Sequence, residues 1–310
     1  MKRIILSLLL AAAAMAALTA QNLPKVFFTK NITPEALLQI YDSLGVEAHG
    51  RVAVKLSTGE PGGHNFLDPQ LIAPLVKQLR ANIVECNTTY AGRRDKTADH
   101  LVAATEHGFT AIAPVDIMDA GGEATLTVRN GRQLKENYVG ARLPDYDFML
   151  VLSHFKGHGM GGFGGALKNI SIGIGSAQGK AWIHTAGKTR TDPWNNLPPQ
   201  DDFLEAMAEA ASSVTDLFGE RIVYISVANN LSVDCDCSSN PAAPQMGDIG
   251  IFASLDPVAL DQACVDAVYA SRDEGKTHLI ERMESRHGIH TIEHAAALGV
   301  GSRQYKLVEF

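Results

Sequence analysis

The chain has 310 residues, 45% hydrophobic and 20% charged, without a low-complexity tract or an internal repeat. This balance excludes a disordered or fibrous chain and predicts an ordered globular protein. The formal net charge is −7 and no cluster of Lys and Arg stands out, which argues against nucleic acid or an anionic membrane as a partner.

The N-terminal residues have the pattern of a secretory signal peptide. Lys2 and Arg3 give a basic start, residues 4–18 form an apolar run, and a small residue, Ala20, precedes Gln21. We expect cleavage after Ala20 and an exported protein, periplasmic or secreted. The run is shorter than the ~20 residues of a membrane span, and no cysteine follows it to carry a lipid, so no stable membrane anchor is expected after cleavage.

The mature domain, residues 21–310, begins with alternating strands and helices. Strands are predicted at 25–30, 51–57 and 82–87, and helices at 33–44, 68–80 and 96–107. Thr33 and Asp68, each followed by proline, cap two of these helices. The alternation predicts an α/β fold with a mostly parallel or mixed sheet and helices on both faces.

The middle of the chain departs from this alternation. Segments 111–118 and 125–128 predict strands, and Asn130-Gly131 is a hairpin-turn signal, so we expect a β-rich excursion. The almost wholly apolar segment 148–154 follows and is typical of a strand covered on both faces. Residues 179–200 are rich in proline and tryptophan and predict an irregular lid or a segment between lobes. A division into two lobes near residues 145–150 stays open.

The last third returns to regular elements. Helices are predicted at 202–218, 256–270, 277–285 and 289–298, and strands at 221–230, 249–255 and 305–310. In open α/β sheets, ligands bind beyond the carboxyl ends of the strands. The loops after Ser57, Asn87, Phe155 and Asn230 are therefore expected to form the site.

The segment after strand 148–154 is the sharpest candidate for a site. Its many glycines let the backbone approach a ligand closely, and an anion could be met by Lys156 and by free amides at the start of a helix from Gly165. On an extended chain, His154, Lys156 and His158 face one side, so the two imidazoles could hold a metal. The alternative is a loop whose histidines only hydrogen-bond to the backbone.

Four cysteines, Cys86, Cys235, Cys237 and Cys264, are too few for a disulfide scaffold. One residue separates Cys235 from Cys237, a spacing at which a relaxed disulfide is difficult to form. We therefore expect metal ligands or redox thiols there, with a disulfide to Cys86 or inert thiols as alternatives. Cys264 lies on an apolar helical stripe and is expected in the core.

Three enzyme motifs bear on the function. His290, Glu293 and His294 match the short HxxEH zinc pattern, but on an expected surface helix near the C-terminus this match does not favour a zinc protease. The chain has no GxSxG elbow and no GxxxxGK[ST] loop, so serine hydrolase and P-loop interpretations lose their usual support.

Several long segments resemble the domain-of-unknown-function family 362, in its branch of uncharacterised iron-sulfur-centre proteins. They are residues 52–62, 87–100, 152–173, 234–237 and 248–263, and SHFKGH followed by GFGGALKN is the most specific part. The resemblance implies an α/β protein of unknown activity, often associated with redox systems. Members of this branch commonly carry a cysteine-rich ferredoxin-like insert after the glycine segment. Residues 179–200 contain no cysteine, so a conventional ferredoxin-type iron-sulfur cluster is not expected.

The polar residues that match the family's segments are Lys55, Glu60, Asn87, Arg94, His100, His154, Lys156, His158, Lys168, Asn169, Cys235, Asp236, Cys237 and Asp248. The resemblance gives no role to any of them, so roles are assigned from residue chemistry.

The leading hypothesis is a metal- or anion-binding site for a small molecule or anion, in which Cys235 and Cys237 supply ligands or redox thiols. The expected catalytic residues are His154, His158 and Glu60, because imidazole and carboxylate can transfer protons. The expected ligand-binding residues are Lys55, Arg94, Lys156, Gly161, Gly162, Gly164, Gly165, Lys168 and Asn169. The expected metal ligands are Cys235, Cys237, His154 and His158. A non-catalytic solute-binding protein and a metal-independent hydrolase or isomerase are the alternatives.

Overall fold

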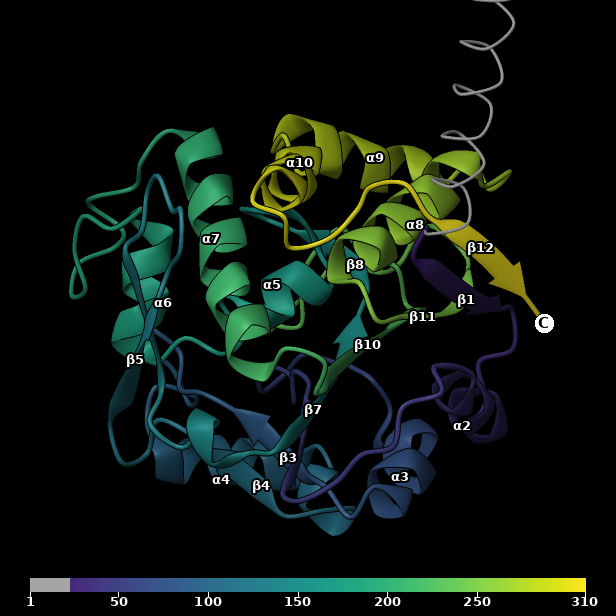
Figure 1. Cartoon of the computed structure of the whole chain (residues 1–310), viewed down its shortest axis with the longest axis horizontal. Helices are drawn as coiled ribbons and strands as arrows, with labels where there is room; N and C mark the ends of the chain where they lie inside the picture. The colour runs from purple at the N-terminus through teal and green to yellow at the C-terminus, as the bar shows by residue number, and fades with distance from the viewer. Residues whose placement is uncertain (1–22) are drawn as a thin grey trace, which may run out of the picture.

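The computed structural model describes residues 23–310, so the predicted signal peptide lies outside the described residues. An eight-stranded sheet crosses the molecule (Figure 1). Its order is β12 (Lys306–Glu309), β1 (Lys25–Thr29), β11 (Gly250–Ser254), β10 (Ile222–Ala228), β7 (Phe148–His154), β2 (Val52–Lys55), β3 (Asn82–Glu85) and β4 (Val115–Ile117).

The sheet is mixed, with a parallel block at its centre. The strands β10, β7, β2, β3 and β4 run parallel to one another, whereas β11 pairs antiparallel with both β10 and β1. The strand β7 lies between β10 and β2 inside the block and is buried along its whole length, as its apolar sequence predicts. The α/β class with a mostly parallel sheet is confirmed.

Helices cover both faces of the sheet. On one face lie α2 (Pro34–Ser43) and α3 (Pro69–Gln78), and α4 (Thr97–Glu106) packs on β4. On the other lie α5 (Ala166–Ile170), α7 (Gln200–Phe218), α8 (Pro257–Ala270), α9 (Lys276–Ser285) and α10 (Ile289–Ala297) (Figure 1). Alternate residues of each strand enter the two cores, since side chains of a strand alternate between its faces.

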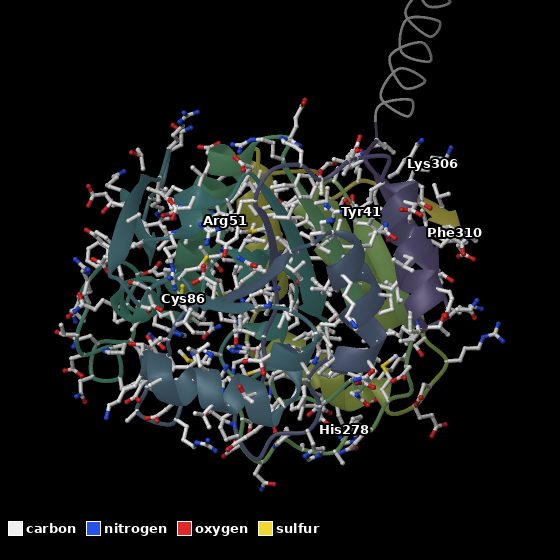
Figure 2. The ribbon with its side chains drawn as sticks, turned by 90° about the horizontal axis from the view of Figure 1, so that it is seen from below. Tyr41, Arg51, Cys86, His278, Lys306 and Phe310 are labelled. Carbon is white, nitrogen blue, oxygen red and sulfur yellow. A yellow bond between two sulfur atoms is a disulfide. The ribbon has the colours of Figure 1, made fainter. Side chains whose placement is uncertain are left out.

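Several helices begin where the sequence predicts. The side chains of Thr33, Asp68 and Asp256 accept hydrogen bonds from backbone amides in the first turns of α2, α3 and α8, and each cap precedes a proline. Such caps satisfy amides that have no partner within the helix. The interior and rim of the fold are seen in Figure 2, where Cys86 lies inside and His278 and Phe310 lie at the periphery.

The excursion between β4 and β7 is a hairpin of β5 (Glu123–Thr127) and β6 (Glu136–Gly140), as the turn signal at Asn130 predicts. The segment that follows α5 differs from prediction. Residues 177–184 form a helix, α6 (Ala177–His184), where an irregular segment was predicted. The side chain of Ile183 in α6 packs with side chains of α7 in a separate small core. This packing stabilises a helix that the sequence pattern does not reveal.

Two short 3₁₀ turns, η1 (Phe109–Ala111) and η2 (Leu143–Asp145), and a small hairpin of β8 (Lys156–His158) and β9 (Gly162–Gly164) complete the fold. Connections from β2 run toward β3 and β4 on one side, while β7 and β10 lie on the other side. The order in which successive strands are added to the sheet therefore reverses between β2 and β7. Ligands of open α/β sheets bind at such a switch point, beyond the carboxyl ends of the strands.

Candidate functional site

A cavity of about 450 Å³ opens at this switch point. Four loops line it, and they are the four that follow β2, β3, β7 and β10. Lys55 ends β2, Glu85 ends β3 and His154 ends β7, so parallel strands deliver polar side chains to one edge of the sheet. The structure thus brings these four loops together around one cavity.

Asp236 joins the loop after β10 to the end of β7. Its carboxylate oxygens accept hydrogen bonds from His154 Nδ1 at 2.8 Å and from Lys156 Nζ at 2.6 Å. His154 Nε2 lies 2.6 Å from the carbonyl oxygen of Asn229. Because both ring nitrogens face groups that accept hydrogen bonds, neither offers a free lone pair to a metal ion.

The side chains of Asp236, His154 and Lys156 are all buried. Burial alone would raise the pKa of Asp236, but the adjacent His154 and Lys156 hold it well below its ordinary value. The carboxylate is therefore charged and neutralises cationic neighbours. The backbone carbonyl of Asp236 also accepts from the amide of Glu60 at 2.7 Å, which ties the loop after β2 to this segment.

Three further lysines approach the cavity from separate elements. Lys55 Nζ donates to the Leu56 carbonyl at 2.5 Å, and Lys180 Nζ, from α6, donates to the Gly175 carbonyl at 2.6 Å. Lys168 extends from α5, and no described residue accepts a hydrogen bond from its Nζ within the usual distance. The cavity thus holds ammonium groups whose hydrogen-bonding capacity is only partly used.

The environment makes these lysines weaker bases than usual. Burial lowers the pKa of Lys55 to about 8, although Glu85 opposes the change. Burial and the neighbouring Lys156 lower the pKa of Lys168 to about 7. Burial also lowers the pKa of Lys180. A bound anion would offset the desolvation of these groups and favour their charged forms.

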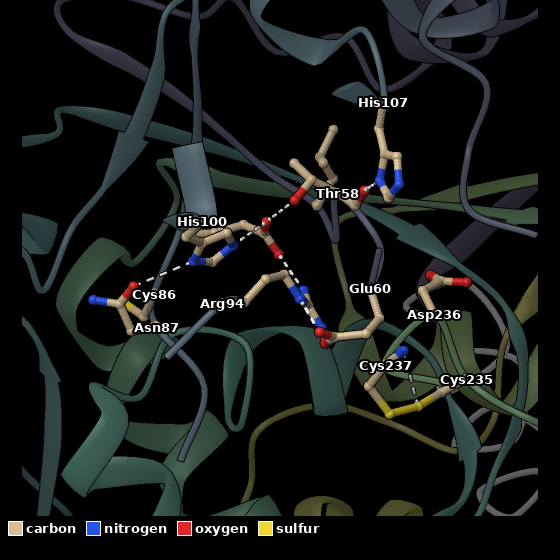
Figure 3. A network of polar contacts seen from close by, with 12 residues as sticks. Thr58, Glu60, Cys86, Asn87, Arg94, His100, His107, Cys235, Asp236 and Cys237 are labelled. Carbon is tan, nitrogen blue, oxygen red and sulfur yellow. Dashed lines mark hydrogen bonds and ion pairs between the residues drawn. A yellow bond between two sulfur atoms is a disulfide. The ribbon is translucent and has the colours of Figure 1, made fainter. Parts of the chain in front are cut away.

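A polar network closes the side of the cavity formed by β3 and α4 (Figure 3). Glu85 accepts from Thr58 Oγ1 and lies 3.1 Å from His100 Nε2. Arg94 donates to Glu60 at 2.9 Å and lies 3.8 Å from Glu85. Glu85 is therefore engaged, and the nearby charges of His100, Lys55 and Arg94 overcome the effect of burial to hold its pKa far below the ordinary value.

Glu60 does not lie where a catalytic role requires. It is not among the residues that line the cavity, and its carboxylate lies behind Arg94 and Tyr90, both of which donate to it at 2.9 and 2.8 Å. The predicted meeting of Glu60 with the histidines in one cavity is wrong, because the ion pair with Arg94 holds it in the wall.

His158 faces the cavity in a defined protonation state. The amide of Gly161 donates to its Nδ1 at 2.8 Å, which requires a lone pair on Nδ1 and places the proton on Nε2. Burial and the charge of Lys168 lower the pKa of His158 well below its ordinary value. The ring is therefore neutral and offers an Nε2–H donor.

The glycines serve packing more than ligand approach. Gly164 and Gly165 line the cavity, but Gly161 and Gly162 do not. The amides of Ala166 and Leu167, at the start of α5, donate to the Asp261 carboxylate at 2.7 and 2.9 Å. The prediction that this helix start offers free amides to an anion is wrong, since a side chain of α8 occupies them. A Cβ on Gly165 would overlap that carboxylate.

The pairing of the cysteines differs from the prediction. Cys235 and Cys237 form a disulfide with each other, which their spacing had argued against, while Cys86 and Cys264 are free and buried. Turn geometry in the loop brings their Cα atoms to 5.2 Å, within the range of ordinary disulfides. Cys264 packs in the core as predicted. Ligand atoms of His158, Cys235 and Cys237 lie within 4.8 Å of one another.

Most predicted site residues therefore share one cavity. Lys55, Arg94, His154, Lys156, His158, Lys168, Asn169, Cys235 and Cys237 all line it. Asn169 donates to the Lys55 carbonyl at 3.2 Å and to Ser153 Oγ at 3.1 Å, so it fixes α5 to the ends of β2 and β7.

The lining residues that sequence reasoning missed include Lys180, Glu85 and His184. Lys180 was missed because α6 was not predicted, and Glu85 could have been found from its position at the end of a predicted strand. His184, also from α6, lies buried beside Lys168 and Lys180, and burial and these charges lower its pKa to about 3.

These features define an α/β protein with a cavity lined by basic side chains at the switch point of its sheet. The chain belongs to the family described as Domain of unknown function (DUF362), whose model matches residues 52–266. No curated protein matches it. Within residues 23–310, the helices are too short or too polar to cross a bilayer.

Two solved structures resemble the chain distantly. One is a crystal structure of a Thermotoga maritima protein, at 14% identity and a TM-score of 0.43, covering 76% of this chain and 58% of that one. The other is the lactate racemase apoprotein from Thermoanaerobacterium thermosaccharolyticum, at 13% identity and a TM-score of 0.43, covering 78% of this chain and 56% of that one. The chain thus spans little more than half the length of either.

Proposed function

We propose that the cavity binds a small organic anion that carries a carboxylate or phosphate group. The observation that carries this is the charge of the wall: five basic side chains, those of Lys55, Arg94, Lys156, Lys168 and Lys180, line it together with two carboxylates, Glu85 and Asp236. Both carboxylates are already engaged by other groups. An anionic ligand would supply the missing negative charge.

The same geometry supports proton transfer on the bound anion. Lys168, with a pKa of about 7, exchanges readily between amine and ammonium at neutral pH, which suits a general base or acid. His158 can donate from Nε2 to a developing negative charge. His154, with both nitrogens engaged, acts as a positioning residue. An isomerase or hydrolase would use these groups, and a solute-binding protein would bind the same anion without turnover.

The test is titration calorimetry of the mature protein with inorganic phosphate and with small mono-, di- and tricarboxylates. Lys168→Met removes the charge and keeps the apolar stem. We expect it to weaken binding at least tenfold, about 1.4 kcal/mol. Lys77→Met, on the exposed side of α3, is the matched control and should leave affinity unchanged. Equal affinity in the wild type and Lys168→Met would refute the assignment.

A second candidate is a soft metal ion at the thiols. The support is the proximity of His158, Cys235 and Cys237, whose ligand atoms lie within 4.8 Å. Two thiolates and an imidazole suit Zn²⁺ or another soft ion once the disulfide is reduced. His158 would have to give up the hydrogen bond from Gly161, because a ring that ligates through Nε2 carries its proton on Nδ1.

Reduced protein would then bind Zn²⁺ at this loop and oxidised protein would not. Zinc titration followed by thiol-reactive dye accessibility separates the two states. The Cys235→Ser, Cys237→Ser double variant should lose the zinc-protected thiols, and Cys264→Ser, in the core, should not. Thiols that stay equally reactive with and without zinc would remove this candidate.

Export to an oxidising compartment is part of the anion-binding proposal, in which the disulfide stays intact. It is supported by the signal-like residues 1–20 and agrees with a disulfide between Cys235 and Cys237. Cell fractionation with N-terminal sequencing of the mature protein tests it. A cytoplasmic protein that retains residues 1–20 would refute it.

A further inference from the structure

The two histidines of the HxxEH pattern face a pair of glutamates on another helix. His290 and His294 are one turn apart on α10, and Glu205 and Glu209 are one turn apart on α7, which packs beside α10 (Figure 1). His290 Nε2 lies 3.3 Å from Glu205 Oε1, and His294 Nε2 lies 3.1 Å from Glu209 Oε1. The glutamate of the pattern, Glu293, instead pairs with Arg303.

Three of the four groups have the composition and spacing of a metal site, and the fourth, His290, lies beside Glu205. Ligand atoms of Glu205, Glu209 and His294 lie within 4.8 Å of one another. In a tetrahedral zinc site with bonds near 2.0–2.1 Å, neighbouring nitrogen and oxygen ligands are separated by roughly 3.3 Å. The two N···O distances in the structure are close to that value, so an ion held by Glu205, Glu209 and His294 would take the place of the proton between His294 and Glu209, and His290 would join it from beside Glu205.

The surrounding chain orients the carboxylates as it would orient ligands. The amides of Arg132, Gln133 and Leu134 all donate to Glu209, at 2.6 to 3.1 Å. Gln133 Nε2 donates to Glu205 Oε2, the carboxylate oxygen that does not face His290, at 2.9 Å. Such hydrogen bonds fix the direction of a metal-binding carboxylate and raise the affinity of its site.

Charge and burial favour a divalent cation here. Glu209 is fully buried and Glu205 nearly so, while the two histidines are partly exposed and leave a route from solvent. Two carboxylates and two neutral imidazoles would neutralise one divalent ion.

We propose that Glu205, Glu209, His290 and His294 form a zinc-binding site separate from the cavity at the switch point. The ion would clamp α10 and the turn at residues 131–134 to α7. It has a structural role in this proposal, since all four protein ligands close the coordination shell.

The test is zinc titration of chelator-treated mature protein in the Cys235→Ser, Cys237→Ser background, which removes the thiols of the other candidate site. We expect one equivalent of Zn²⁺ and a higher melting temperature when it binds. His294→Gln and Glu205→Gln keep polar groups that can hydrogen-bond, and each should lower zinc affinity roughly 10- to 100-fold or more. His278→Gln, on the exposed face of α9, is the matched control.

Co²⁺ in place of Zn²⁺ gives a second readout that needs no substitution at the site. A four-coordinate site of two histidines and two carboxylates should produce intense visible absorption bands. Absence of a zinc equivalent in the Cys235→Ser, Cys237→Ser background would overturn the proposal. So would binding that His294→Gln and Glu205→Gln leave unchanged while circular dichroism shows both variants folded.

Discussion

The charge of single residues decides what the cavity can hold. Lys55 and Lys168 are lysines whose pKa values, about 8 and about 7, lie well below the ordinary value because burial penalises the ammonium form. Around neutral pH, a change of one pH unit therefore alters the charge of the wall. An anionic ligand would stabilise the protonated forms and bind most tightly at the acidic end of this range.

These shifts predict how stability depends on pH. The folded-state pKa values lie below the unfolded value of ~10.4, so the unfolded chain binds more protons above pH 7 and the folded state gains stability as pH rises. We expect the urea midpoint of the ligand-free protein to rise between about pH 7 and 8.5. A Lys55→Met, Lys168→Met variant should show a flatter rise. A wild-type midpoint that falls across this window would contradict the shifts.

Asp236 makes the opposite case, a carboxylate that buried cations need. Asp236→Asn would leave the charges of His154 and Lys156 without their partner, and breaking a buried pair in this way costs about 3–5 kcal/mol. Urea unfolding measures the loss. Asp234→Asn, two residues away and partly exposed beside Arg282, should cost less than about 1 kcal/mol. Equal losses of unfolding free energy in the two variants would show that the hydrogen bonds of Asp236 with His154 and Lys156 stabilise the protein no more than a partly exposed ion pair.

At the scale of elements, the short helix α5 depends on α8. Asp261 accepts the first two amides of α5, and α5 in turn carries Lys168 and Asn169 into the site. Asp261→Ala should destabilise the protein by about 1–3 kcal/mol, because two buried amides lose their acceptor. Asp261→Asn keeps one acceptor oxygen and should lose less. Urea midpoints in which Asn and Ala behave alike would argue against a role for the hydrogen bonds.

Sequence reasoning predicted most elements, because caps and apolar periodicity are local properties. Thr33, Asp68 and Asp256 marked helix starts that the structure confirms. The helix α6 was missed because it is stabilised by packing against α7 rather than by its own pattern. The role of Gly165 was misjudged for a similar reason. Its missing Cβ makes room for Asp261, which is 96 positions away in the sequence and invisible to local reasoning.

At the scale of the whole molecule, the fold determines which distant groups meet. The prediction that loops after successive strands share one edge follows from parallel strands alone, and it brought His154, Lys156 and Asp236 together correctly. Strand order could not be predicted from the sequence. The antiparallel strand β11, placed between β10 and β1, depends on tertiary pairing rather than on local pattern. The pairing of Cys235 with Cys237 likewise depends on a loop conformation.

The central claim is that an anion occupies the space between the lysines of β2, α5 and α6. The most direct measurement is an anomalous difference map from crystals of the mature protein soaked in selenate, whose heavy atom marks the position of a bound oxyanion. The account predicts a peak inside the cavity within hydrogen-bonding distance of Lys168 Nζ, and its loss in Lys168→Met crystals. A cavity without a peak at saturating selenate, or a peak that persists in the variant, would contradict it.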